Sequence, residues 1–470
     1  MAFDIKRFKL GLSCWCVVAG SAIGVGCGGD HGWAVTNPPA DTAKATQPTT
    51  PPPPPQPQPT AHSGYFVAAN GSSSADGSQA RPWDLATAVS GGAGHVHPGD
   101  TVWVRAGTYY APFRTTFTGT AAQPIVLRAY PGERAVIDGV NTTSDNFVVQ
   151  GSYTVIWGLE FTNSSSSRYT PDINHDYRAD LVVNKASHTK YVNLIAHDGG
   201  AGFYNYSSET DVEVYGGVFY NLGWQAPDRG HGHALYLKAD VGPMVARDNV
   251  VFNQYGYGIH VYSNAGDGLL NNIRLEGNVS FDNGSLASTG TSANLGNLGV
   301  MPANNLAFTG NMTYMAPTLS GANVTVGSGS GLTLTNNYVV GGDGMTQDSW
   351  TGNVLRSANT VIAAGRSAQA PTVFVRPNAY EAGRAMVVIY NPSEQGGVAV
   401  NLGGVLNAGD RFEVRNVQDL RGTPVTSGTY GGGMVNVPMG GVTPPTPIGL
   451  SSSQAPRTGP GFDVFIVTKL

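Results

Sequence analysis

The segment "HALYLKADVGPMVARDNVVFNQYGYGIHVYSN", residues 233–264, consists of short apolar runs separated by turn residues. Within the runs apolar and polar residues alternate, which is the pattern of half-buried β-strands. The runs also recur beyond this segment, because Leu194, Val218, Val250 and Val279 follow one another at intervals of 24, 32 and 29 residues. A repeat of this length, built from strands alone, predicts a β-solenoid whose coils bury their core against their neighbours.

The composition agrees with an all-β chain. Only 12% of the 470 residues are charged, whereas Gly occurs 64 times and Pro 30 times. Such a composition favours many short strands joined by tight turns. The net charge of −5 and the absence of a basic block argue against nucleic acid as a partner.

The N-terminus has the pattern of an export signal. Lys6, Arg7 and Lys9 precede the apolar stretch Leu10–Gly26, which ends in "GVGC" at Cys27. This segment resembles a bacterial lipoprotein signal, and the resemblance implies lipidation of Cys27. An ordinary signal peptide or a short membrane anchor is the alternative. We therefore expect an extracytoplasmic protein, either lipid-anchored to the envelope or secreted, and a monomer as the simplest state.

The remaining chain divides by composition. Cys14 and Cys16 lie inside the signal, so the mature chain would contain no disulfide. Residues 28–62 are rich in Pro and Thr and predict an extended linker. We place the solenoid at residues 63–368, with a small helix at Pro82–Val89 whose Leu85, Ala86 and Val89 would close its first coil.

The fold resembles a known class. The strand repeats resemble the PbH1 repeats of right-handed parallel β-helix proteins of the pectate-lyase-like superfamily. Residues 99–139, from "GDTVWVRAGTYYAPF" to "PIVLRAYPGERAVIDG", are similar to the opening coils of the alginate lyase and chondroitinase B family. This resemblance implies a polysaccharide-related function without fixing it, since one fold hosts lyases, hydrolases, epimerases and binding proteins.

Residues 369–470 follow another pattern. Alternating runs such as "AMVVIYN" and "DVFIVTK" lie between Gly and Pro turns, and predict an antiparallel β-sandwich. The segment is similar to the all-β domains that close many carbohydrate-active enzymes. Such a domain binds sugar or caps the last coil, and we favour the cap.

Strand alternation predicts which side chains face outward. Leu235 and Leu237 should face the core, as should Phe203 and the pair Ile259 and Val261 in the neighbouring coils. The outward residues then form three columns across adjacent coils, and a column of small residues beside a tall aromatic one predicts a groove for a saccharide. The columns are Gly202, Ala234 and Gly258; Tyr204, Tyr236 and His260; and Tyr206, Lys238 and Tyr262.

These residue types suit lyase chemistry on a uronate-containing polysaccharide, or the related C5-epimerase chemistry. A base removes the C5 proton, an acid assists the leaving oxygen, and a cation neutralises the carboxylate. We assign the base to Lys238, which could instead be the cation. The acid would be Tyr236 or His260, either of which could instead be a base with a lowered pKa. The carboxylate would be held by Arg247, Arg229, His231 or His233.

Other readings remain open. The patch could be a solvated face, and the protein a non-catalytic polysaccharide-binding or structural lipoprotein. His231 and His233 could bind a metal with Asp228 or His197, although no further ligand spacing supports this. The lyase family named above carries an Asn-Glu pair for calcium, which has no clear counterpart here, so the cofactor is left unknown.

Two further sets of polar residues are considered. Asp180 and the pair His197-Asp198 are the acidic candidates for a β-helix glycoside hydrolase, although no "DD" pair is present. Asn249, Asn278 and Asn311 occupy similar turns, where stacked amides hydrogen-bond to one another. We therefore expect a structural asparagine ladder.

Overall fold

The computed structural model describes residues 64–140, 144–173, 177–264, 266, 268–288, 303–321, 323–451 and 456–470, together with the backbone of 295–297. They belong to one compact unit, residues 52–470. The predicted signal, the lipidated Cys27 and the linker lie outside the described residues. None of the described helices is long and apolar enough to cross a membrane.

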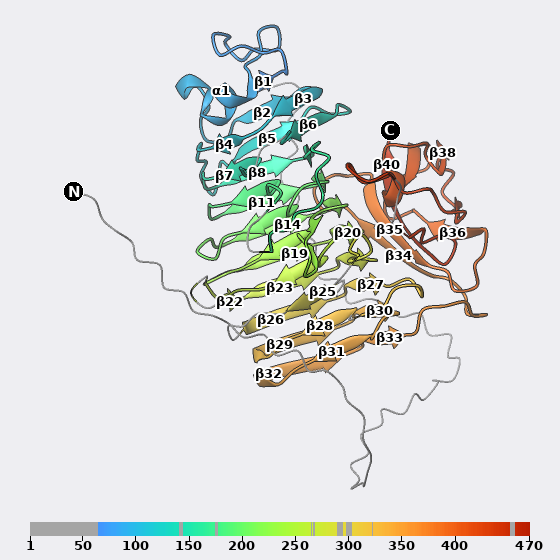
Figure 1. The fold of residues 1–470 in the computed structure, drawn as a ribbon. Helices are drawn as coiled ribbons and strands as arrows, with labels where there is room; N and C mark the ends of the chain where they lie inside the picture. The colour runs from blue at the N-terminus through green and yellow to red at the C-terminus, as the bar shows by residue number, and fades with distance from the viewer. Residues whose placement is uncertain are drawn as a thin grey trace. The chain divides into compact units, whose positions relative to one another are not determined.

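The body is a parallel β-helix made of three sheets, which confirms the predicted fold class (Figure 1). Successive strands enter different sheets, and strands of adjacent coils pair in parallel register. Val218, Val250 and Val279 are aligned as the repeat predicts. In the preceding coil the partner of Val218 is Ile195 and not Leu194, so that alignment was wrong by one residue.

Sheet A contains 12 strands and forms one wall of the solenoid. Most of its inward residues are Val, Leu, Ile and Met, which suits a sheet that is buried on its inner face. Its strands are β1 (Tyr65–Val67), β2 (Thr101–Val104), β5 (Ile125–Ala129), β8 (Thr154–Trp157), β11 (Thr189–Val192), β14 (Val212–Tyr215), β19 (Met244–Arg247), β22 (Leu270–Asn271), β23 (Ile273–Glu276), β26 (Ala303–Thr309), β29 (Gly329–Thr335) and β32 (Trp350–Ser357).

Sheet B contains 10 strands and follows sheet A around each coil. Its outer face carries large aromatic residues, which the C-terminal domain covers. Its strands are β3 (Gly107–Tyr110), β6 (Ala135–Asp138), β9 (Glu160–Thr162), β12 (Ile195–His197), β15 (Val218–Tyr220), β20 (Val250–Phe252), β24 (Val279–Phe281), β27 (Met312–Tyr314), β30 (Tyr338–Val340) and β33 (Thr360–Ile362).

Sheet C contains nine strands and closes the coil. Its strands are short, and their inward residues complete the main apolar core. They are β4 (Phe113–Thr115), β7 (Phe147–Val149), β10 (Val182–Asn184), β13 (Phe203–Asn205), β18 (Leu235–Leu237), β21 (Ile259–Val261), β25 (Leu295–Asn297), β28 (Val324–Val326) and β31 (Met345–Gln347).

A ladder of asparagines ties the coils together at the turn between sheets A and B. The Nδ2 of Asn249 donates to Oδ1 of Asn278 at 3.0 Å, and Asn278 donates in the same way to Asn311 at 3.0 Å. Asn337 and Asn359 continue the ladder. The prediction of a structural asparagine ladder is confirmed, and the ladder is longer than predicted.

A small helix, α1 (Leu85–Val89), lies at the first coils (Figure 1). It begins after Pro82, with Asp84 as N-cap accepting from the Thr87 amide. Leu85, Ala88 and Val89 join the main core, whereas Ala86 is exposed. The capping role is confirmed, but the predicted start at Pro82 and the inward position of Ala86 were wrong.

The C-terminal domain is a β-sandwich, as predicted. A five-stranded antiparallel sheet and a two-stranded one share an apolar core. The five-stranded sheet contains β34 (Thr372–Pro377), β35 (Arg384–Tyr390), β40 (Phe462–Lys469), β37 (Arg411–Asn416) and β38 (Thr426–Thr429). The short helix η2 (Val417–Asp419) lies between β37 and β38. The smaller sheet contains β36 (Gly397–Asn401) and β39 (Met434–Pro438).

The sandwich covers the flank of the solenoid and does not cap its end. Alternate residues of β35 enter two different cores: Val387 faces the inside of the sandwich, and Val388 packs on the aromatic residues of sheet B. At the last coil, Val361 pairs with the buried Val339 yet is 50% exposed. The predicted cap of the last coil was therefore wrong, because the domain's apolar face matches sheet B.

Candidate functional site

The strand register of sheet C brings the predicted aromatic column together. Tyr204 pairs with Tyr236, and Tyr236 pairs with His260. The two tyrosine rings stack with centroids 4.9 Å apart, and the ring of His260 lies 5.4 Å from that of Tyr236. All three line one hollow of about 490 Å³, so the column is confirmed as part of a pocket.

The column of small residues differs from the prediction. Ala234 is completely buried in the main apolar core. A Cβ added to Gly202 would come within 2.8 Å of side-chain atoms of Phe219 and Leu222. These residues precede their strands, where the backbone turns toward the interior, and Gly258 is buried as well. They pack the turn and do not form an open groove floor.

Lys238 joins the pocket from the end of β18. Its Nζ lies 5.5 Å from the ring centroid of Tyr204 and 5.4 Å from that of Tyr236, within reach of cation–π attraction. The backbone carbonyl of Lys238 accepts from the side chain of Asn205 at 2.9 Å, which fixes the chain there. The amine is thus held beside the aromatic wall, and the residue is only 5% exposed.

A short hairpin supplies the other wall. β16 (Trp224–Gln225) and β17 (Gly230–His231) pair antiparallel between β15 and β18. Trp224 stacks on His231 at 5.4 Å, and Asp228 orients His231 through a 2.9 Å hydrogen bond. The hairpin also brings Arg229 to the pocket, whose lining further includes Asp180, Ala201, Gly232, His233, Tyr257, Tyr262 and Asn264.

Among the described residues, two buried polar atoms of this lining have no hydrogen-bond partner. They are Nε2 of His260 and Nε1 of Trp224, on residues that are 6% and 4% exposed. A buried polar group without a partner costs roughly 1–3 kcal/mol, and a bound ligand or water would remove that cost. The pocket therefore offers hydrogen-bonding capacity that the fold leaves unused.

The two central histidines are neutral at physiological pH. Burial, followed by the charge of Arg229, lowers the pKa of His260 to about 3. Burial, followed by the charges of His260 and Arg229, also lowers the pKa of His233 well below its usual value. The ring nitrogens of the pair approach to 3.3 Å. The lowered pKa favours a neutral imidazole at His260, which suits a hydrogen-bonding group or a base better than a cationic acid.

Two predicted residues lie outside the pocket lining. Tyr206 is 41% exposed next to Tyr204, with ring centroids 5.0 Å apart, and Nζ of Lys185 lies 4.4 Å from its centroid. Arg247 is on β19 of sheet A, paired with Glu276 at 2.6 Å. Its assignment to the groove is therefore corrected, because residues nine positions after Lys238 already belong to another wall.

The described residues do not form the alternative metal site at His231 and His233, nor a pair of carboxylates for a hydrolase in the pocket. Within the ranges that the structure describes, no group of three His, Cys, Asp or Glu side chains is placed to hold a metal. His197 instead bonds to Asp198 at 2.8 Å and to Glu160 at 3.0 Å on sheet B. In the described lining of the pocket, Asp180 is the single carboxylate.

The sequence did not predict the hairpin that carries Trp224, nor the pocket residues Tyr257 and Asn264 on either side of β21. A signal was present, because Tyr204 and Tyr236 are 32 residues apart and Tyr236 and His260 only 24. The longer coil contains an insertion rich in polar residues, and such insertions lie at turns that border a binding face.

The comparisons with known proteins agree with the fold. A family model described as "Pel9A-like, right handed beta helix region" matches residues 65–299. The crystal structure of pectate lyase Pel9A is 18% identical, with a TM-score of 0.44, over 63% of this chain and 78% of that chain. None of the curated proteins matches this sequence.

Two other solved structures are similar in the same region. One is described as a rhamnogalacturonan lyase, with 15% identity and a TM-score of 0.47 over 63% of this chain and 86% of that one. The other is an alginate lyase from Paenibacillus sp. str. FPU-7, with 15% identity and a TM-score of 0.33 over 60% of this chain and 96% of that one.

Proposed function

Since this chain belongs to the family of Pel9A-like right-handed β-helices, we propose that it binds an acidic polysaccharide in the pocket on sheet C and cleaves it by β-elimination. The observation that carries the proposal is the placement of the Lys238 amine. It lies against two stacked tyrosines, in a hollow that also contains Arg229. A ring wall, a base and a second cation are the parts that this reaction needs.

In the proposed reaction Lys238, in its neutral form, removes the C5 proton of a uronate. The electron pair forms the C4–C5 double bond, and the bond from C4 to the glycosidic oxygen breaks. Tyr236 donates a proton to that oxygen, while Arg229 neutralises the carboxylate and so makes the C5 proton acidic. The neutral His260 and the Trp224 indole hydrogen-bond to substrate through the two atoms that lack partners. C5-epimerisation begins with the same proton abstraction.

The sugar itself would stack on the tyrosine rings. Tyr204 and Tyr236 present parallel faces, inclined by 19°. Aromatic faces bind the apolar C–H side of a pyranose and expose its hydroxyls to polar partners. The cations Lys238 and Arg229 in the same hollow favour an acidic saccharide as the substrate.

The test is an absorbance assay of the purified protein with alginate, polygalacturonate, chondroitin and heparin, each with and without calcium. Elimination creates an unsaturated uronate, which absorbs in the near ultraviolet, so a rising trace identifies a lyase and its polymer. A flat trace with proton exchange at C5 identifies an epimerase. A flat trace without exchange and without new reducing ends contradicts catalysis.

A non-catalytic, polysaccharide-binding role is the second candidate. It is favoured by the low exposure of Lys238 and by its contact with both rings, which suits a structural cation as well as a base. The same purified protein would then retain affinity for one of the polymers without turnover. A glycoside hydrolase is less well supported, because hydrolysis needs two carboxyl groups and the described lining holds one.

We also propose that the protein is exported and anchored through Cys27, on the strength of the N-terminal sequence pattern. Metabolic labelling with a fatty acid should mark the wild type and leave Cys27→Ser unlabelled. Labelling of the variant, or recovery of the wild type in the cytoplasm, contradicts this proposal.

A further inference from the structure

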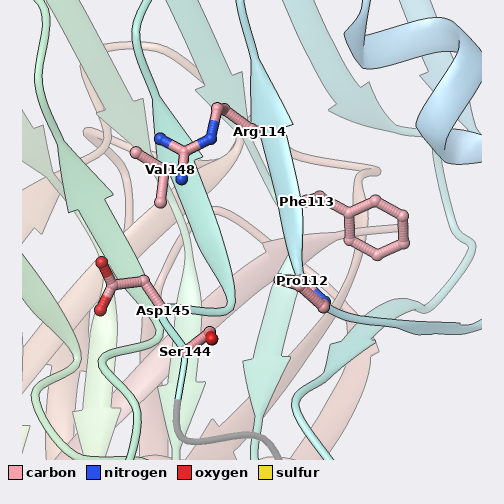
Figure 2. A pocket seen from close by; sticks show the side chains of 6 residues that line it. All are labelled: Pro112, Phe113, Arg114, Ser144, Asp145 and Val148. Atoms are coloured by element: carbon pink, nitrogen blue, oxygen red, sulfur yellow. The ribbon is translucent and has the colours of Figure 1, made fainter.

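A second hollow lies on the same face of the solenoid, nearer to the first coils. It measures about 460 Å³ and is lined by Pro112, Phe113, Arg114, Ser144, Asp145 and Val148. Figure 2 shows Arg114 reaching over the neighbouring strand toward Val148, while Phe113 points away on the other side of its strand. Nothing in the proposed reaction uses this hollow.

The strand register connects it to the aromatic pocket. Arg114 pairs with Val148, Val148 with Val183, and Val183 with Tyr204. These residues occupy one continuous column along sheet C. Because parallel strands are spaced about 4.8 Å apart, Arg114 lies about 14 Å from Tyr204 along the face. Val148 and Val183 lie between Arg114 and Tyr204 in this column, and both are buried. The two hollows are therefore separate, although they lie along the same column.

The cations of this face recur at regular intervals. Arg114 is on β4, Lys185 directly follows β10, and Lys238 directly follows β18, so each is two strands from the next in the order of sheet C. The spacing is about 10 Å along the face. Arg114 is exposed and has no ion pair with any described residue, and the described contact of Lys185 is the ring of Tyr206. Arg114 thus offers its positive charge to a ligand, and Lys185 offers its charge beside the Tyr206 ring.

From the pocket toward the last coils, the column of outward residues on sheet C is uncharged where the structure describes it. Beyond His260 the column continues through Gly296, Thr325 and Thr346. The described side chains there are threonines, whose hydroxyls lie 3.5 Å apart. In this direction the described residues of the column carry no charge.

We propose that the Arg114 hollow is a distal subsite for the same acidic polysaccharide, and that Lys185 bridges it to the aromatic pocket. This inference rests on the proposed function. The polymer would extend from the pocket toward the N-terminal coils, with carboxylates meeting Arg114, Lys185 and Lys238 in turn. Cations distributed along one face attract a charged polymer and discriminate against a neutral one.

The experiment measures the affinity of the full chain for size-fractionated oligomers of polygalacturonate and alginate, as Kd, or as KM where the oligomer is cleaved. For Arg114→Gln we expect a loss of about fivefold with long oligomers, the size of one exposed charge contact. The loss should vanish below a threshold length and at high salt. Lys185→Gln should show a shorter threshold.

Thr325→Ala is the matched control, since it lies on the same column in the other direction. It should leave the length dependence unchanged. Equal losses for short and long oligomers in Arg114→Gln, or none at any length, overturn the subsite while wild-type binding preserves the proposed function. If the wild type binds neither acidic series, both proposals fall together.

Discussion

Sheets B and C carry aromatic ladders on the same coils. The ladder on sheet B is covered by the C-terminal domain, whereas the ladder on sheet C faces a hollow. On sheet B, Phe252 and Phe281 stack at 4.8 Å, and the neighbouring Tyr314 stacks on Phe462 of the C-terminal domain at 4.5 Å. On sheet C, Tyr204 and Tyr236 stack at 4.9 Å and face a hollow. Stacked rings alone therefore do not mark a binding site, and the site proposed above lies on the face that the second domain leaves uncovered.

The two faces also differ in how their polar groups are partnered. On sheet B, His197 is held between Asp198 and Glu160, and Arg134 and Arg421 close the network around Glu160. These ions satisfy one another. In the pocket on sheet C, Nε2 of His260 and Nε1 of Trp224 have no hydrogen-bond partner among the described residues, which leaves both atoms able to bond to a ligand.

The largest effect should come from Lys238→Ala. Under the proposed mechanism the variant loses its base, and we expect turnover to fall by about a thousandfold or more while the fold persists. The measurement is the initial rate of near-ultraviolet absorbance, with circular dichroism and thermal unfolding as checks on folding. Lys238→Arg is the matched control, because it keeps the cation but is a far poorer base. Full activity in Lys238→Ala would remove the base assignment.

A substitution in the aromatic ladder of sheet B should lower the stability of the fold and leave the activity of the pocket unchanged. Phe462 is completely buried between the domain and sheet B, so Phe462→Ala should cost about 3–5 kcal/mol. Denaturant unfolding measures the loss. The specific activity of the folded fraction should stay that of the wild type, because the pocket is on the other face. A loss of activity per folded molecule would show that the two faces are coupled.

The histidines of the two faces should give opposite dependences of stability on pH. Burial lowers the pKa of His197, but the hydrogen bonds with Asp198 and Glu160 outweigh it and raise that pKa to about 9. His197 therefore stabilises the fold fully below its unfolded pKa of about 6.5, and the stabilisation is lost as pH rises toward 9. For His260, with its pKa lowered to about 3, stability is lost as pH falls from about 6.5 toward 3.

The measurement is the unfolding free energy across pH 4–9 for the wild type, His197→Gln and His260→Gln. The difference between wild type and variant should slope by at most about 1.4 kcal/mol per pH unit, in the alkaline window for His197 and in the acidic window for His260. Slopes in the same window for both variants would contradict the difference between the two environments.

The sequence allowed the repeat, the inward residues and the aromatic column to be predicted, because a two-residue alternation fixes the facing of Leu235 and Tyr236 once the strand is recognised. It failed where the chain leaves that alternation. Ala234 lies at a turn, where the backbone bends inward, and the hairpin that carries Trp224 belongs to an insertion. The position of the sandwich depends on surface complementarity with sheet B, which no local pattern records.

Arg247 shows that two residues close in the sequence of a solenoid can lie on different sheets. Its substitution should have the smallest effect on activity among these variants. It follows Lys238 closely in the chain but belongs to sheet A, where it pairs with Glu276 and lies 3.9 Å from Glu213. Arg247→Gln should therefore leave kcat/KM within about twofold of the wild type and cost about 1 kcal/mol of stability, as a partly exposed ion pair does. Arg229→Gln is the contrasting variant, because Arg229 lines the pocket, and it should lower kcat/KM tenfold or more by removing the charge that neutralises the carboxylate. If the two arginines exchanged these roles in the assay, the reactive face would be sheet A, and the comparison of covered and uncovered ladders would have to be redrawn around it.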